Sequence, residues 1–477
     1  MTNPDDKHPD YAEYFPVWKK CRDAAGGQRL IKKGTTLYLK KLQDQPNDAY
    51  LSYLDRAVFF GATGRTVEAM TGLVFQKQMD FEAPPAVKQW AEDITLSGEN
   101  LIEFAQTAIA ENIIVARSGI LVEQPVAVAA DLTLAQKEAL GVRPYLVLYQ
   151  TESIINWEYA RVGNVMRLVN VWLSENYKDD NGETADQIRQ LTLGSGAYLQ
   201  IIWRKSDGVN WIVYETIKPT KSGAAIPEIP FFPIALQKPK LDPVAPPIEP
   251  LADINIAHFK NSADLENGAH IAGLPTPWVS GADSTDGEGQ AVTIYLGSST
   301  ILMLPKDAQA GFLQCGSEGF ATIEKLMDRK EQQMAALGAR MLSPEKKQAE
   351  AAETHEIKRG GENSVLATMA GVVERQITKA LQFAADWENI TGEIYVELNK
   401  DYVPFNLSGQ DLASWTAALQ AGTISKETYF NILKWGGYYA DETTFEEEQD
   451  RIAEDGPPLG TLTDEETTPP ANDNGDD

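Results

Sequence analysis

The chain has 477 residues, too many for one ordinary hydrophobic core, so we expect two or three structural regions. Hydrophobic residues make up 43% of it, which excludes a largely disordered protein, and its two cysteines, Cys21 and Cys315, exclude a disulfide framework. The net charge of −27 argues against a protein that grips nucleic acid, because such binding depends on Lys and Arg neutralising phosphates. With no apolar run of about 18 residues and no signal pattern at the start, we expect a soluble protein made in the cytosol, without a membrane partner.

The first part of the chain reverses this acidic balance. Between Tyr14 and Leu42 a single acidic residue, Asp23, stands against eight basic ones: Lys19, Lys20, Arg22, Arg29, Lys32, Lys33, Lys40 and Lys41. One interpretation is a solvated basic face that balances the acidic body. The other is a docking patch for an acidic partner or nucleic acid.

Residues Tyr50 to Phe75 have the pattern of packed helix, and we expect Tyr53, Leu54, Ala57, Val58 and Met70 in the core. Within this stretch, residues 61–66 approach the spacing of a phosphate-binding loop. The motif is not met, because Phe59 stands where it needs Gly and Arg65 where it needs Lys.

The next part of the chain predicts a mixed α/β body. Residues Asn100 to Ala116 form an amphipathic helix pattern, and a strand is expected from Ile120. Further strand patterns, separated by turn residues, predict a largely antiparallel sheet: Tyr145–Tyr149, Ile154–Trp157, Met166–Leu173, Tyr198–Trp203 and Trp211–Tyr214. Eight prolines between Pro227 and Pro250 then predict stiff extended chain.

Residues Asp253 to Ala272 predict a helix that is polar on most of its faces. Such a helix is unstable alone or packs against copies of itself.

Two short strands are expected between Ala291 and Leu304.

The longest regular pattern runs from Glu318 to Ile390 and predicts two amphipathic helices, the first of about six turns. A charged segment, Ser343 to Gly361, separates them and is expected to be a mobile loop. A strand at Tyr395–Leu398 and a compact helical unit from Ser408 to Tyr439 follow. From Asp441 to the end, 14 acidic residues and one basic residue carry 14 − 1 = 13 of the 27 net negative charges.

A search for catalytic or metal-binding patterns finds none. No pair among His8, His258, His270 and His355 has the i, i+4 spacing of a helical zinc site, and no nucleophile elbow or dinucleotide fingerprint is present. We therefore expect no enzyme activity, no cofactor and no metal.

Several stretches, in order along the chain, resemble the portal-protein family of tailed bacteriophages. Their specificity lies in their number and order, and together they cover about Tyr14 to Trp435: Cys21–Ala24, Tyr53–Ala57, Gly119–Val122, Ala252–Asn255, Ser262–Glu266, Leu274–Pro277, Met334–Leu342 and Gly361–Ser364.

The resemblance implies an α+β fold with the parts of a portal subunit. Residues 1–250 would form a mixed α/β wing and residues 251–290 a helical stem with a small clip. Residues 291–400 would return through the wing with long helices at 320–342 and 364–387, broken by a tunnel loop at 343–361. Residues 401–455 would form a helical crown, and 456–477 a disordered acidic tail.

The resemblance also implies the function: a ring of twelve copies at one capsid vertex of the virion, assembled in the host cytoplasm. Double-stranded DNA would pass through it during packaging, retention and ejection. The implied partners are the terminase large subunit, which would hydrolyse the ATP, the major capsid protein, the scaffolding protein and a head-tail adaptor or tail protein. An acidic body suits a channel that DNA must pass without sticking.

Two groups of residues are the candidates for the DNA channel. Those in the tunnel loop are Lys346, Lys347, His355, Lys358 and Arg359, and those in the stem are His258, Lys260, Asp264 and Glu266. An exposed loop with balanced charges explains residues 343–361 equally well. The alternatives for the whole chain are another head-tail connector or virion structural protein, or a soluble α/β ligand-binding protein or enzyme.

Overall fold

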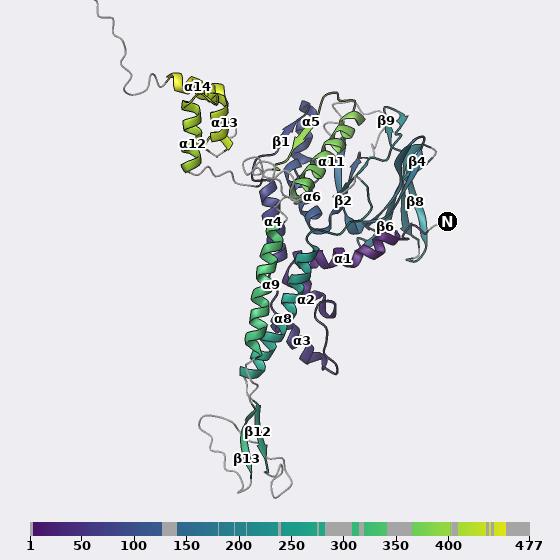
Figure 1. Ribbon diagram of the computed structural model, residues 1–477. Coiled ribbons are helices and arrows are strands. Elements are labelled where there is room, and N and C mark those ends of the chain that lie inside the picture. The colour runs from purple at the N-terminus through teal and green to yellow at the C-terminus, as the bar shows by residue number, and fades with distance from the viewer. Residues whose placement is uncertain are drawn as a thin grey trace, which may run out of the picture. The chain divides into compact units, whose positions relative to one another are not determined.

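The structure is a computed structural model (Figure 1). It describes residues 3–125, 141–179, 181–194, 196–206, 208–236, 240–273, 276–281, 308–313, 319–340, 365–400, 402, 409–435, 438–439 and 443–454. The chain divides into two compact units, Met1–Tyr402 and Val403–Asp477. Both contain helices, and the first also contains antiparallel sheets, so the α+β class is confirmed.

The first unit begins with helices. They are α1 (Pro9–Ala25), α2 (Gln28–Lys33), a short 3₁₀ helix η1 (Thr35–Leu37), α3 (Asn47–Arg56) and α4 (Ala62–Val74). The expected core residues Tyr53, Leu54, Ala57 and Met70 are buried. The prediction for Val58 is wrong, because its side chain is 52% exposed in the connection between α3 and α4.

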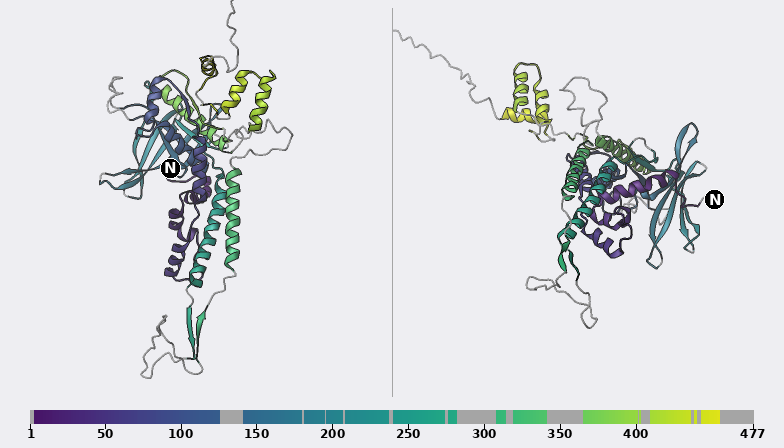
Figure 2. Two further views of the ribbon diagram at one scale, coloured as in Figure 1. Left: turned by 90° about the vertical axis from the view of Figure 1, so that its left-hand side faces the viewer. Right: turned by 60° about the horizontal axis from the view of Figure 1, so that its bottom comes forward.

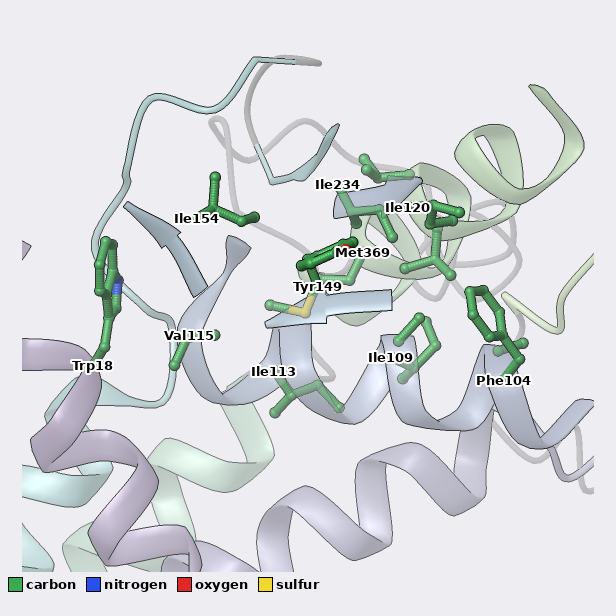
Figure 3. Packing of buried hydrophobic residues seen from close by; sticks show 14 of the residues in the cluster. Trp18, Phe104, Ile109, Ile113, Val115, Ile120, Tyr149, Ile154, Ile234 and Met369 are labelled. Atoms are coloured by element: carbon green, nitrogen blue, oxygen red, sulfur yellow. The ribbon is translucent and has the colours of Figure 1, made fainter. Parts of the chain in front are cut away.

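A long buried helix forms the centre of this unit. Helix α6 (Leu101–Val115) begins with a capping box, in which Asn100 Oδ1 accepts from the Glu103 backbone N–H and the Glu103 carboxylate accepts from the Asn100 N–H. It ends at Ala116, whose left-handed backbone turns the chain into β2 (Arg117–Glu123). Figure 3 shows Ile109 and Ile113 of α6 among the buried side chains of β2, β3 and α11.

Two larger sheets follow. One has the order β11–β2–β3, with β3 at Tyr145–Gln150 and β11 at Phe231–Ala235. The other has the order β4–β5–β6–β7–β8, and every neighbouring pair in both sheets is antiparallel. The strands of the five-stranded sheet are β4 (Ile154–Val162), β5 (Val165–Lys178), β6 (Thr184–Gly194), β7 (Ala197–Lys205) and β8 (Trp211–Ile217).

The antiparallel arrangement agrees with the prediction, but β6 was not expected from the sequence. The polar residues Asp186, Arg189 and Gln190 interrupt the apolar alternation of this strand in the sequence. In the fold, their side chains bond to groups on neighbouring strands. Pro233 lies in β11, an edge strand, where the missing N–H costs no ladder bond.

Small elements complete the body. They are η2 (Ala91–Asp93), η3 (Thr151–Ser153), α5 (Pro85–Trp90) and two strand pairs: β1 (Asp80–Glu82) with β14 (Tyr395–Glu397), and β9 (Thr220–Lys221) with β10 (Ala224–Ala225). Strand β14 confirms the strand expected at Tyr395.

The two long helices expected after Glu318 are present as α9 (Phe320–Arg340) and α11 (Val365–Trp387). Helix α11 is largely buried against α6, β2 and β11. The polar helix is α8 (Glu249–Gly273), which begins four residues before the predicted Asp253 and includes Pro250, the last of the eight prolines, in its first turn. The strands expected at Ala291–Leu304 lie outside the described residues, and a pair β12 (Thr276–Ser280) and β13 (Gln309–Leu313) is found on either side.

The second unit holds α12 (Gly409–Gln420), α13 (Lys426–Trp435) and α14 (Phe445–Glu454). Phe430 of α13 lies between Tyr439 and Phe445, with ring centroids 4.8 and 5.7 Å away, and fixes α14 to α13. Helix α14, with Glu446, Glu447 and Glu448 in its first turn, lies beyond the compact helical unit expected at Ser408 to Tyr439 but within the helical region expected at 401–455.

Candidate functional site

The candidate site is an antiparallel helix pair, α8 and α9, which we call the arm. Its register is fixed by three cross-helix contacts. His258 Nε2 lies 3.2 Å from Glu331 Oε1, Lys330 Nζ donates to the Ala257 carbonyl at 2.8 Å, and Gly268 lies against the Phe320 ring. Any side chain on Gly268 would collide with that ring, so the glycine sets how closely the helices approach. Figure 2 shows the pair side by side along its length.

Helix α8 is polar on its exposed side, as expected, but three of its polar residues are buried: Asn255, His258 and Ser262. Asn255 is fully buried; its Oδ1 accepts from the Thr63 backbone N–H and from Thr63 Oγ1 (2.8 Å), and its Nδ2 donates to the Phe60 carbonyl (2.6 Å). It thereby satisfies the Thr63 N–H, one of the backbone donors in the first turn of α4 that have no partner within the helix. Ser262 Oγ accepts from the Val58 N–H at 3.2 Å in the same way. These side chains hold α8 to the α3–α4 connection.

The second half of α8 is held to α3. The Tyr53 hydroxyl donates to Asp264 Oδ1 at 2.5 Å, and Arg56 Nη1 donates to Asn267 Oδ1 at 3.3 Å. Beyond these bonds, His270 and Ile271 are exposed. The chain then leaves α8, forms the β12–β13 pair and re-enters the arm at Phe320.

His258 is the most constrained titratable residue of the arm. Its side chain is 4% exposed, and its Nδ1 has no hydrogen-bond partner among the described residues. Burial lowers the pKa of His258, while the bond to Glu331 opposes that shift. The ring is therefore neutral at pH 7 and donates from Nε2 to the carboxylate.

The outer side of α9 carries charges of both signs. Glu324, Lys325, Asp328 and Arg329 are exposed, so two anions stand with two cations. Such a surface neither binds a polyanion strongly nor repels it strongly.

Of the four predicted stem residues, two are structural and two are free. His258 and Asp264 bond to α9 and α3, whereas Lys260 and Glu266 are exposed and make no hydrogen bond or ion pair with any described residue. The tunnel-loop candidates Lys346, Lys347, His355, Lys358 and Arg359 lie outside the described residues. Asn255 and Ser262 were missed, although polar residues repeating at helical spacing among apolar neighbours are the signal that could have found them.

Buried arginines stiffen the body that carries the arm. Arg117 is fully buried and donates to the carbonyls of Leu241, Thr151 and Ile154, with its guanidinium 4.3 Å from the Trp157 ring centroid. Burial lowers the pKa of Arg117 to about 9, although the charges of Asp242 and Glu152 oppose that shift.

Two other arginines are held by pairs of carboxylates. Arg22 bonds to Glu111 and Glu152, and Arg189 bonds to Glu123 and Glu175. These contacts raise the pKa of both guanidinium groups above the ordinary value, against the effect of burial. The Arg22 contacts join α1 to α6 and η3, and the Arg189 contacts join the two large sheets.

The described residues contain no group of three or more His, Cys, Asp or Glu placed to hold a metal ion. The larger hollows have mainly apolar or mixed walls; one of about 510 Å³ lies between α4 and α9 and is lined by Phe60, Met70, Leu73 and Met334 among others. No helix in the described ranges is long and apolar enough to cross a bilayer.

Comparison with known proteins gives one family match, over part of the chain. A family described as "Domain of unknown function (DUF4055)" matches residues 247–388, the part of the chain that holds the arm and α11. No curated protein matches.

Two solved structures are similar in chain course. One, described as "Virion of native gene transfer agent (GTA) particle", is 12% identical, with a TM-score of 0.40 over 85% of this chain and 98% of the matched chain. The other, "Neck of empty GTA particle computed with C6 symmetry", is also 12% identical, with a TM-score of 0.40 over 83% and 96%. A likeness at this level carries no conclusion about function.

Proposed function

We propose that this chain is the repeating subunit of a phage portal, a ring at a capsid vertex through which double-stranded DNA enters and leaves the head. The observation that carries the proposal is the arm: an antiparallel helix pair anchored to a rigid α/β body through α8, with the outer side of α9 left open and balanced in charge. The ordered resemblance to the portal family supports the same conclusion.

In this proposal the parts take the roles implied by the resemblance. Residues 1–250 form most of the wing, α8 the stem, the β12–β13 pair part of the clip, residues 343–361 the tunnel loop and residues 401–455 the crown. The ring is a dodecamer and a component of the virion. Its partners are the capsid protein, scaffolding protein, terminase and a head-tail adaptor, and the chain itself has a mechanical, not a catalytic, role.

The physical chemistry of the arm fits a DNA channel. A channel wall must not release many counterions from DNA, because each phosphate neutralised by a basic residue adds to binding. The mixed charges of α9 and the net charge of −27 meet this requirement. The buried arginines and the Asn255 contacts supply the rigidity that a load-bearing ring needs.

The experiment that tests the proposal is native mass spectrometry of the purified protein together with negative-stain class averages. We expect a closed ring of about a dozen subunits with a central hole. A monomer or dimer that forms no ring, even with capsid or scaffolding protein present, would overturn the proposal.

A further inference from the structure

The fold divides the basic residues near the N-terminus into two groups with different roles. Four are used inside the chain. Lys19 pairs with Asp23, Lys20 with Glu249 and Asp253, Arg22 with Glu111 and Glu152, and Lys32 donates to the Asp55 carbonyl. The other four, Arg29, Lys33, Lys40 and Lys41, are exposed, and no hydrogen bond or ion pair joins them to a described residue.

Exposed leucines lie among these free cations. Leu37 is 59% exposed, Leu42 64% and Leu51 49%. Large apolar side chains that remain in water beside a row of unpaired charges are typical of a surface that is covered in an assembly.

The cations and leucines belong to one folded segment, residues 28–56, which we call the basic leucine face. The Lys32 ammonium ties α2 to the end of α3, and the buried Tyr50 hydroxyl donates to the Leu39 carbonyl at 2.9 Å. Helix α3 packs on α8, and Figure 2 shows it on the side of α8 away from α9, so α9 does not cover it.

The charge of this segment is opposite to that of the rest of the chain. It contains six basic residues (Arg29, Lys32, Lys33, Lys40, Lys41, Arg56) and three acidic ones (Asp44, Asp48, Asp55), which gives 6 − 3 = +3. Since the whole chain carries −27, the remaining 477 − 29 = 448 residues carry −27 − 3 = −30. Any other large part of a second copy is therefore, on average, acidic.

We propose that the basic leucine face binds the neighbouring copy of this chain in the ring. The inference rests on the proposed function, because it names the surface through which one copy joins the next in the ring. Copies with a charge of −27 repel one another, so a ring needs contacts that offset this repulsion. A head-to-tail ring joins two different faces of the subunit. Placing this basic face against an acidic face of the next copy supplies attraction, and the leucines add apolar burial.

Duplex DNA is a poorer occupant of this face. Phosphates would pair with the four free cations, but Leu37, Leu42 and Leu51 would remain in water, because a phosphate backbone offers them no apolar surface. A second protein chain satisfies both kinds of side chain at once.

Two double variants of the full-length protein test the inference: Lys40→Glu with Lys41→Glu, and Leu37→Ser with Leu42→Ser. The matched control is Arg375→Glu with Lys379→Glu on α11, which makes the same change of charge at exposed positions elsewhere. Circular dichroism and thermal melting verify folding, and native mass spectrometry over a concentration series gives the fraction of rings. We expect each face variant to need about tenfold more protein than the wild type to form rings, and the control to behave as the wild type.

The outcomes separate this inference from the proposed function. If the wild type forms no ring, the proposed function fails and this inference fails with it. If the wild type forms rings and both face variants do so at the same concentration, only this inference is overturned. If the face variants form rings normally but lose binding to a short DNA duplex that the wild type binds, the face is a nucleic-acid site and the inference is again overturned.

Discussion

His258 and Glu331 join the two helices of the arm through a contact of 3.2 Å between imidazole Nε2 and carboxylate Oε1. The imidazole is buried while the carboxylate side chain is 46% exposed, so the pair sits at the boundary between the arm interior and solvent. Lys330, one residue away on α9, bonds to the Ala257 carbonyl, and Phe60 covers the ring with its centroid 5.6 Å away. Protonation of this one histidine would therefore place a charge in the interior of the arm, at one of the three contacts that fix the register of α8 against α9.

The first prediction concerns pH. In the folded chain the pKa of His258 lies below the ordinary 6.5, so the unfolded chain binds the proton more readily. Stability from this group is then fully present above about pH 6.5 and decreases as the pH falls below that value. The melting temperature of the wild type should fall between neutral and mildly acid pH. In His258→Gln this fall should be smaller, because the titrating group is gone. The exposed His270→Gln is the control and should leave the pH profile unchanged.

A second prediction concerns the buried amide of Asn255. Asn255→Leu would remove the acceptor of the buried Thr63 N–H and hydroxyl, and the donor to the Phe60 carbonyl, which keeps its bond from the Ala62 N–H. We expect a loss of about 2–4 kcal/mol in the free energy of unfolding, because unpaired buried polar groups are costly. Urea denaturation followed by circular dichroism measures it. Asn261→Leu on the same helix is the control, and equal losses in both variants would mean that the Asn255 bonds do not hold α8 to α4.

A third prediction concerns Arg117. Arg117→Lys keeps the charge but cannot reproduce a guanidinium that donates to three carbonyls while stacked against Trp157. Its loss should destabilise the body by about 2–4 kcal/mol in denaturant unfolding. The exposed Arg161→Lys should change nothing measurable. Unchanged stability of Arg117→Lys would show that the buried bonds are replaceable.

The fourth prediction tests the proposed tunnel loop. Lys346→Glu with Lys347→Glu reverses two charges in a segment whose four basic and four acidic residues balance. We expect rings to assemble normally while DNA packaging and retention decrease, since repulsion would replace transient contacts with phosphates. Packaged DNA per particle is the measurement. Normal packaging and retention in particles with normal rings would mean that these lysines do not touch DNA.

The exposed surface of α9 illustrates a limit of sequence pattern. Its apolar spacing predicted the helix correctly, but among the side chains of α9 that the structure describes only Met334 is buried, and Leu326 is 45% exposed. Periodicity reports that a helix has an apolar side; it does not report how much of that side the same chain covers.

The sequence by itself determined the class and the order of the elements. Helical spacing located α6, α9 and α11, alternation located most strands of the large sheet, and the prolines marked the chain before α8. These are local properties, fixed by backbone geometry and the period of apolar residues.

Only the tertiary structure decided how the polar residues are used. Asn255, His258 and Asp264 look alike in a sequence, as polar positions on one helix, yet one satisfies the start of α4, one joins α9 and one accepts from Tyr53. Likewise, eight basic residues in one stretch separate into four internal partners and four free cations. The reason is physical: a hydrogen bond or ion pair needs a partner within about 3 Å. The partners of Asn255, His258 and Asp264 are 73 to 211 residues away in the sequence and are brought there only by the fold.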